Sequence, residues 1–306
     1  MPEAERLSYS VSPGSAAMKH AILGAGAIGG LVGAALASLG EEVTVIVRPE
    51  KLADYPKSLT LERPSGTITA AAKAVATLTE PVDVLWIATK TYQLHTALES
   101  VRSSPALVVP LLYGVEHIEV LRARFSKDRV VPATIAVEAE RIAPGHFVQR
   151  SPFVRLNVAA SGEPRLGALV ARLVEIGFTC QFMQNEQTLL WSKLCFLSPF
   201  ALLTSASGKN AGEVFSDAEW KRKLDLAIAE ACAVAKASGA EVDVAKLQSV
   251  FENMPSGMRS SMQKDVAAKR QLELDAIGGP IVRGGQRYGI DVPTTAGLME
   301  MIRSKE

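Results

Sequence analysis

The sequence predicts an α/β fold in which an N-terminal domain built on a parallel sheet is followed by an all-α C-terminal domain. Three observations predict it. A length of 306 residues exceeds what one hydrophobic core normally supports. Segments typical of buried strands recur up to Met183, separated by Pro, Gly or charged residues. Beyond Met183 the strand signals stop and the pattern is helical. We therefore expect three segments: a disordered tail at 1–17, an α/β domain at 18–184 and a helical domain at 185–306.

The first elements form a strand–turn–helix–strand unit. Residues 19–24 are a short apolar strand, and 27–39 are an apolar segment of helical length without Pro. Residues 42–47 are dense in β-branched side chains, as a strand buried on both faces should be. The three together predict a βαβ unit. Further strands are expected at 67–70, 82–88, 106–111, 130–136, 153–158 and 177–183.

The C-terminal part predicts helices separated by Gly and Pro breaks. The breaks fall at Gly208, Gly239, Pro255 and Pro293. The expected helices are 186–205, 217–238, 244–253, 263–288 and 294–303.

Composition excludes several classes of function. With 33 basic and 32 acidic residues, the chain has no broad positive field, so no nucleic-acid partner is expected. The longest strongly apolar stretch, 194–203, is too short to cross a bilayer, so we expect no membrane span. The first 17 residues lack the apolar centre of a secretory signal, and Met1 and Met18 are both candidate starts. Three widely spaced cysteines predict buried thiols in the cytoplasm and no metal site.

A glycine motif follows the first strand directly. Gly24, Gly26 and Gly29 form G-x-G-x-x-G at the opening of a helix. In this context the glycines permit a tight turn, let backbone N–H groups approach a pyrophosphate and bring helix and strand together. The alternative is an ordinary glycine turn. We expect a Rossmann-type domain that binds a dinucleotide through Gly24, Ala25, Gly26, Ala27, Ile28 and Gly29.

Basic residues stand where two of the strands end. After the second strand, NAD-binding proteins usually carry an acid, but here Arg48 follows, with Lys51 as a possible helper. This favours NADPH, because a cation there meets the 2′-phosphate. The alternative is a solvated surface charge. Lys90 ends the segment 82–90 at the carboxyl edge of the sheet, near cofactor or substrate. A surface lysine at a strand end explains Lys90 equally well.

Two charged residues stand out in the helical part. Lys193 lies in the apolar segment WSKLCFLSPF, so its ammonium either reaches solvent or faces a polar pocket. Glu273 lies among further charges in KRQLELD, where a solvated helix face is the simpler explanation.

Four motifs together resemble the ketopantoate reductase family. They are GAGAIGG, Lys90 after the fourth expected strand, WSKL at the start of the helical domain, and SSMQKDVAAKRQLELDAIGG followed by YGIDVPTT. The resemblance spans nearly the whole chain from Met18 onward. It implies NADPH-dependent reduction of a 2-oxo acid to a 2-hydroxy acid, nominally ketopantoate to pantoate in pantothenate biosynthesis.

The resemblance also implies roles for single residues. It makes Lys193 the general acid and Glu273 a substrate-binding or Lys193-orienting group. It places Ser261 at the substrate carboxylate and Lys90 beside cofactor and substrate. Ser261 is equally explained as a helix cap. An unbroken helix would separate Ser261 from Glu273 by about 18 Å, so if both belong to one site the chain must turn between them, just after Ser261.

Three positions depart from the family pattern. Tyr113, in the loop beside the cofactor, stands where the family has an asparagine. Leu197 and Ala201, on the substrate-facing stripe of the Lys193 helix, also replace asparagines. Because buried amides discriminate strongly for a substrate hydroxyl, their loss favours a more apolar or bulkier 2-oxo acid than ketopantoate. The alternative is that all three pack in the core and other side chains supply the polar contacts.

Two further functions stay open beside the reductase. One is a related dehydrogenase that acts on another carbonyl or an imine. The other is an NADPH-binding sensor without turnover, against which the presence of Lys193 and Glu273 argues. The apolar helical domain is compatible with a homodimer, but no residue identifies an interface.

Overall fold

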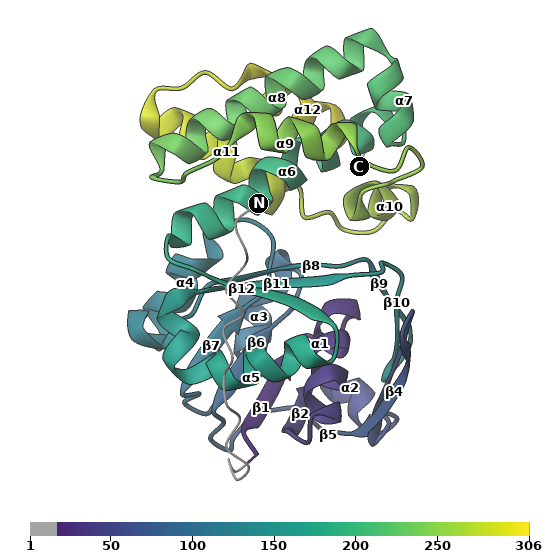
Figure 1. The fold of residues 1–306 in the computed structure, drawn as a ribbon, viewed down its shortest axis with the longest axis vertical. Helices are drawn as coiled ribbons and strands as arrows, with labels where there is room; N and C mark the ends of the chain where they lie inside the picture. Colours follow the sequence, from purple (N-terminus) through teal and green to yellow (C-terminus); the bar gives the residue numbers. More distant parts are fainter. Residues whose placement is uncertain (1–16, 306) are drawn as a thin grey trace, which may run out of the picture. The chain divides into compact units, whose positions relative to one another are not determined.

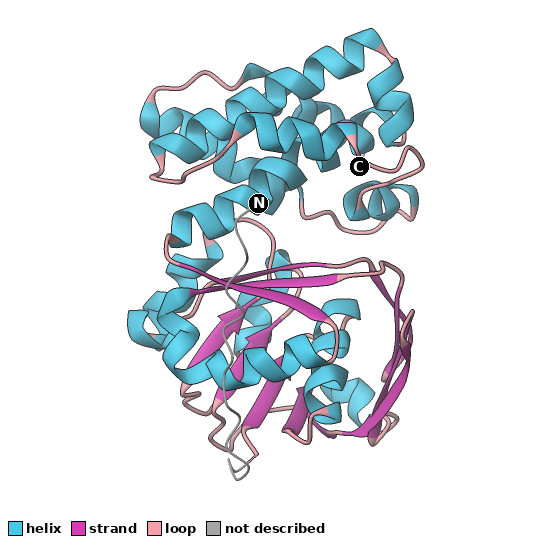
Figure 2. Ribbon diagram, in the orientation of Figure 1, coloured by secondary structure: helices cyan, strands magenta, loops and turns pink. Residues whose placement is uncertain are grey.

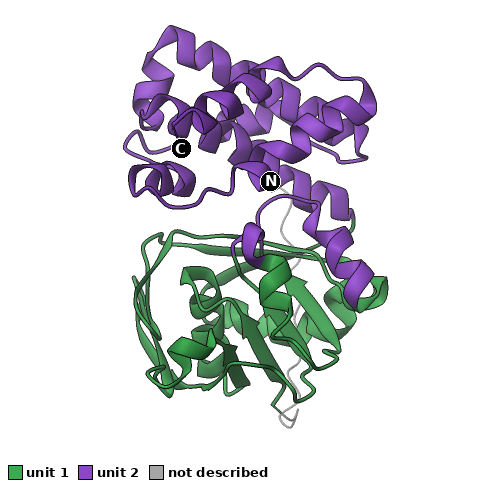
Figure 3. Ribbon diagram, turned by 180° about the vertical axis from the view of Figure 1, so that it is seen from behind, with its two compact units in different colours: residues 1–89, 94–111, 125–184 green, residues 90–93, 112–124, 185–306 purple. Residues whose placement is uncertain are grey.

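The computed structural model describes residues 17–305, so the tail expected at 1–17 lies outside it except for Ala17. The described chain forms two compact units (Figure 3). Unit 1 comprises 17–89, 94–111 and 125–184 and contains all the described strands, whereas unit 2 comprises 90–93, 112–124 and 185–305 and is helical (Figure 2). Two short segments from the first half of the chain thus belong to the helical unit, which a single boundary near residue 184 does not anticipate.

Unit 1 is built on a five-stranded parallel sheet in the order β5-β2-β1-β6-β7 (Figure 1). Its strands are β1 (Lys19–Leu23), β2 (Glu42–Ile46), β5 (Lys73–Val75), β6 (Val84–Ile87) and β7 (Leu107–Pro110). The strands β6 and β7 are wholly buried, as the runs of apolar residues predict. The chain proceeds outward from β1 through β2 on one side and through β6 on the other. This reversal beside β1 is the point where open α/β sheets bind their ligands.

Two smaller sheets complete unit 1. The four-stranded sheet has the order β4-β3-β10-β9 and the three-stranded sheet the order β12-β11-β8. Their strands are β3 (Ser58–Arg63), β4 (Gly66–Ala71), β8 (Ala133–Ala136), β9 (Ala139–Ala143), β10 (His146–Gln149), β11 (Val154–Ala159) and β12 (Phe178–Met183). Helix α1 (Ala27–Ser38) contacts both the parallel sheet and the four-stranded sheet. A side chain at Gly30 would collide with the ring of Phe147 on β10, so the apolar helix must be rich in glycine to fit there.

Short helices connect and cover the sheets of unit 1. They are α2 (Pro49–Leu52), α3 (Leu94–Leu98) and α5 (Glu163–Glu175). The buried leucines of α5 face β12. Strands β3, β5, β9 and β10 are not among those expected from the sequence, and β9 shows why, because four of its five residues are exposed and carry no apolar alternation.

Unit 2 packs its helices around α6 (Glu186–Ser207), which contacts α7, α8, α10, α11 and α12. Its helices are α4 (His117–Phe125), α6, α7 (Ala211–Ser216), α8 (Ala218–Ala237), α9 (Val244–Glu252), α10 (Ser261–Ala267), α11 (Leu274–Tyr288) and α12 (Pro293–Arg303). By length and composition α6 is the one helix among residues 17–305 that could span a membrane. However, 78% of its most apolar stretch is buried inside the protein, so it is the core helix of this unit.

The single helix predicted at 263–288 is wrong. Helix α10 ends at Ala267 and α11 begins at Leu274, with Lys269 between them in the left-handed region at φ 50°. Asp265 closes this turn, since its backbone carbonyl accepts from the Arg270 N–H at 2.9 Å and its carboxylate from Arg270 Nε at 2.7 Å. The chain thus leaves the helix in a turn held by these two hydrogen bonds, which helix propensity alone does not predict.

Candidate active site

The glycine turn of unit 1 has the geometry of a dinucleotide-binding loop. Gly24 has φ 103°, and a Cβ there would lie 2.7 Å from the backbone of Ala88, so only glycine fits. At Gly29 a Cβ would lie 2.1 Å from the Gly24 carbonyl oxygen, which allows helix and strand to meet closely. At Gly26, the N-cap of α1, a Cβ would meet nothing within 4 Å. The turn therefore leaves open space in front of a helix N-terminus without acidic residues, which suits a pyrophosphate.

Two arginines of unit 1 lie near this edge of the sheet. Arg48 follows β2, the strand paired with β1, and its side chain is 77% exposed and lies 3.4 Å from Glu50. It is thus free to meet an anion. Arg141, on β9, donates from Nη1 to the Ala25 carbonyl oxygen at 3.3 Å. No local pattern predicts a role for Arg141, because 116 residues separate it from the loop that it touches.

In unit 2, Lys90 is held by two carboxylates. Its Nζ lies 2.8 Å from Glu273 Oε2 and 3.3 Å from Asp265 Oδ2. The other Glu273 oxygen accepts from the backbone N–H and the hydroxyl of Thr91, at 3.0 and 3.2 Å. Burial lowers the pKa of Lys90, but the two carboxylates outweigh it and hold that pKa above its ordinary value. Lys90 is therefore a fixed cation in a buried network.

Lys193 lies on α6 in a different environment. Its Nζ lies 5.0 Å from the centroid of the Tyr113 ring, a cation–π contact. Within residues 17–305 its ammonium forms no hydrogen bond or ion pair that meets the usual distance limits, since Glu273 bonds Lys90 and Thr91 instead. Burial lowers the pKa of Lys193 to about 8, and the negative charge of Glu273 opposes this only in part. Glu273 thus acts on Lys193 electrostatically, while its hydrogen bonds go to Lys90 and Thr91 and not to Lys193.

Tyr113 contacts Lys193 directly and Thr91, the residue next to Lys90. Its ring lies beside the Lys193 ammonium, its hydroxyl is 3.4 Å from Ser261 Oγ, and its carbonyl oxygen accepts from Thr91 Oγ1 at 3.4 Å. Burial raises the pKa of its phenol, which stays neutral. The next residue, Gly114, has φ 79°, and a Cβ there would lie 2.6 Å from the Ala276 carbonyl oxygen. Only glycine permits this close approach, which fixes the Tyr113 loop against α11.

Ser261 and Glu273 do reach one site, because the break between α10 and α11 replaces the long helix. The turn comes after Ala267, six residues later than expected. The N-cap of α10 is Ser260, whose Oγ accepts from the Gln263 N–H at 3.1 Å, so Ser261 is not the cap and its hydroxyl is available near Tyr113.

The two apolar replacements on α6 differ in position. Leu197, one turn after Lys193, is half-buried. Ala201 is fully buried in the helical core and does not reach an open surface. The structure thus groups Lys90, Tyr113, Ser261 and Glu273 with Lys193. Ala201 packs in the core, which agrees at this position with the alternative that the replaced asparagines are core positions.

Three residues that lie beside this group, Thr91, His117 and Asp265, were not singled out from the sequence. His117 begins α4 and is only 4% exposed. Among the described residues neither ring nitrogen meets full hydrogen-bond geometry, although the Tyr113 backbone lies close enough to act on the ring. Burial, reinforced by the charge of Lys193, lowers the pKa of His117 to about 4, so the ring is neutral. No pattern of residues near His117 indicates this, since one histidine before an ordinary helix carries no signal.

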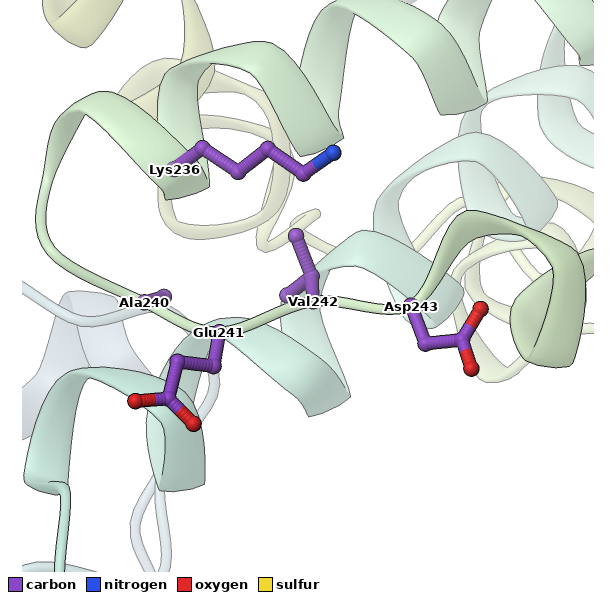
Figure 4. A pocket seen from close by; sticks show the side chains of 5 residues that line it. All are labelled: Lys236, Ala240, Glu241, Val242 and Asp243. Carbon is purple, nitrogen blue, oxygen red and sulfur yellow. The ribbon is translucent and has the colours of Figure 1, made fainter.

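A separate hollow of about 300 Å³ lies at the end of α8 (Figure 4). It is lined by Lys236, Ala240, Glu241, Val242 and Asp243. None of the residues grouped around Lys193 lines it, so it is distinct from the candidate active site.

Comparison with known proteins gives one consistent result. Family models described as "Ketopantoate reductase PanE/ApbA" and "Ketopantoate reductase PanE/ApbA C terminal" match residues 20–161 and 185–306. A 2-dehydropantoate 2-reductase of Caulobacter vibrioides is 32% identical over 93% of this chain and 98% of its own length. An uncharacterized oxidoreductase of Bacillus subtilis, YkpB, is 26% identical over 90% of this chain and 95% of its own.

Solved structures show the same relationship. A PanE/ApbA family ketopantoate reductase from Ralstonia eutropha superposes with a TM-score of 0.84 at 28% identity, covering 94% of this chain and 98% of that one. A D-mandelate dehydrogenase, solved with NADH and anilino(oxo)acetate, has a TM-score of 0.81 at 24% identity, over 94% of this chain and 98% of its own, and shares the fold. The resemblance found in the motifs is thereby confirmed, and the chain belongs to the ketopantoate reductase family of oxidoreductases.

Proposed function

We propose that this protein reduces a 2-oxo acid to a 2-hydroxy acid with NADPH, either ketopantoate to pantoate or a more apolar 2-oxo acid. One observation carries the proposal. The helical unit holds an ammonium with a pKa of about 8, Lys193, in a half-buried group with Glu273, Lys90, Ser261 and Tyr113. A lysine near neutral pKa is a useful proton donor, and burying one for structural reasons alone would be costly.

The chemistry assigns Lys193 the proton. Reducing a ketone places hydride on carbon, which a bound nicotinamide supplies, and leaves negative charge on oxygen. The Lys193 ammonium stabilises that charge and then donates a proton to the oxygen. Because its pKa is lowered to about 8, Lys193 releases the proton more readily than an ordinary lysine and is still mostly protonated at neutral pH.

The neighbouring groups support binding of an anionic acid. The Ser261 hydroxyl, which has only a long contact to Tyr113, is available to donate to the substrate carboxylate. Glu273 keeps the local charge balanced and anchors Lys90, and we assign it the positioning of the substrate and of Lys193 by charge. Lys90 supplies a fixed positive charge for the acid or for the cofactor.

A panel of 2-oxo acids tests the proposal directly. Oxidation of NADPH is followed at 340 nm with ketopantoate and with branched and aromatic 2-oxo acids, in wild type and in Lys193→Ala. We expect turnover in wild type and its loss in the variant, with unchanged NADPH affinity. Absence of wild-type turnover on every oxo acid contradicts the proposal and favours an NADPH-binding sensor.

The preference for NADPH rests on Arg48 and has its own test. Arg48→Ala removes the cation that would pair with the 2′-phosphate, so we expect the KM for NADPH to rise about tenfold or more while the KM for NADH stays the same. Lys127→Ala, at an exposed lysine of the same unit that lies outside the glycine turn and the end of β2, is the matched control. An unchanged KM for NADPH in Arg48→Ala would show that Arg48 is only a surface charge.

A further inference from the structure

The surface beside the Lys193 ammonium is aromatic and apolar. The Tyr113 ring presents itself to Nζ at 5.0 Å, and Leu197 follows Lys193 by one helical turn. Both side chains are half-buried and pack against the helical core, so each keeps one exposed side. A substrate whose oxo oxygen meets Lys193 therefore places its own side chain near this surface.

The carboxylates nearby are already committed, and the Ser261 hydroxyl is the group assigned to the substrate carboxylate. Glu273 bonds Lys90 and Thr91, and Asp265 bonds Lys90 and Arg270. The Tyr113 hydroxyl lies at the rim of its ring, toward Ser261. An amide at either apolar position would offer both a donor and an acceptor to a substrate hydroxyl, whereas an aromatic face and a leucine offer neither.

Building on the proposed function, we propose that Tyr113 is the specificity-determining residue and selects 2-oxo acids with an apolar, hydroxyl-free side chain. A substrate hydroxyl that packs against the face of the Tyr113 ring loses its hydrogen bonds to water, and the ring offers no donor or acceptor to replace them. An apolar or flat side chain gains contact with the ring instead. The selection is expected to be moderate, because an apolar surface rejects an added hydroxyl by about a hundredfold at most.

A matched pair of substrates isolates the hydroxyl. Ketopantoate and 3,3-dimethyl-2-oxobutanoate differ only in that hydroxyl, and phenylglyoxylate adds a flat ring. We expect wild type, with saturating NADPH, to have a kcat/KM at least about tenfold higher for 3,3-dimethyl-2-oxobutanoate than for ketopantoate. Turnover of both with a preference for ketopantoate overturns this inference and leaves the proposed reductase intact, whereas no turnover of any of the three overturns the function itself.

Three variants locate the selectivity. Tyr113→Asn is expected to lower the ratio of the two kcat/KM values by about tenfold or more, and Leu197→Asn to lower it in the same direction. Tyr113→Phe is expected to keep the wild-type ratio, because the ring and not the hydroxyl makes the selection. Leu226→Asn, at an exposed leucine of α8, is the matched control and should leave the ratio unchanged.

The outcomes separate clearly. A ratio that Tyr113→Asn does not move, or one that collapses in Tyr113→Phe, contradicts the assignment to the ring. Circular dichroism and thermal melting establish that each variant is folded. If Tyr113→Asn does not fold, the wild-type ratio together with Leu197→Asn and Tyr113→Phe decides the question.

Discussion

Unit 2 contains two half-buried lysines whose pKa values are shifted in opposite directions by their surroundings. Lys90 pairs with Glu273 and Asp265, which hold its pKa above the ordinary value. Lys193 has an aromatic ring beside it and no ion pair among the described residues, and burial lowers its pKa to about 8. The comparison shows how one fold assigns two roles to one residue type, since a paired lysine is a permanent charge and a desolvated one can exchange a proton.

Replacing the desolvated lysine tests the comparison most severely. Lys193→Met removes the proton donor, and we expect kcat for reduction to fall about a thousandfold. The apolar side chain also relieves the cost of burying a charge, so thermal stability should stay the same or rise. Steady-state kinetics and melting curves measure both, with Lys221→Met, on the surface pair with Asp225, as control. A variant that keeps more than a tenth of wild-type turnover would rule out Lys193 as the acid.

Removing the charge from the shared carboxylate has the next largest effect. Glu273→Gln leaves Lys90 with Asp265 alone and withdraws the negative charge that acts on Lys193. We expect kcat/KM to fall about a hundredfold. Stability should fall by about 1–3 kcal/mol, because Lys90 is only partly exposed and loses its shorter ion pair.

Chemical denaturation and kinetics of Glu273→Gln check both effects. The control is Glu219→Gln, since Glu219 pairs with Lys223 on the exposed face of α8 and such a pair contributes about 0.5 kcal/mol or less. Equal losses of stability in the two variants would mean that the Glu273 pair is an ordinary surface ion pair.

The sequence predicts much of the fold because the evidence for it is local. The strand β1, the glycine turn and α1 follow from adjacent residues, and each strand expected in unit 1 is present. Strands such as β9 could not be predicted in this way, because an exposed strand owes its position to its partner β10 and not to apolar periodicity.

The candidate site depends on contacts that no local pattern encodes. Lys90 and Glu273 are 183 residues apart in the chain and meet at 2.8 Å. Their meeting requires the turn between α10 and α11, in which Asp265 pairs with Arg270. The family resemblance indicated which residues belong to the site. It did not predict that Glu273 forms its ion pair with Lys90 instead of Lys193.

The pH dependence of the reaction distinguishes the two lysines again. Reduction needs the protonated form of Lys193, so kcat/KM should fall about tenfold per pH unit above pH about 8. Oxidation of the hydroxy acid needs the neutral amine and should rise over the same range and level off above it. Lys90 stays charged throughout, because its carboxylate partners raise its pKa. A reduction rate that stays flat up to pH 10 would be inconsistent with Lys193 as the proton donor.

The smallest effect concerns His117, which shares the desolvated environment of Lys193. Neither buried ring nitrogen forms a hydrogen bond of full geometry with the described residues, the Tyr113 backbone being the nearest partner, and such groups cost stability that an apolar side chain of similar shape does not. At pH 7 the low pKa keeps the wild-type ring neutral. The free energy of unfolding of His117→Phe, measured by chemical denaturation, should therefore equal that of the wild type or exceed it by up to about 1 kcal/mol. A lower free energy of unfolding in His117→Phe would mean that the ring makes a hydrogen bond in solution.

His20→Phe, in unit 1, provides the contrast. The His20 ring accepts from Trp86 Nε1 at 3.2 Å, so its removal should destabilise the protein.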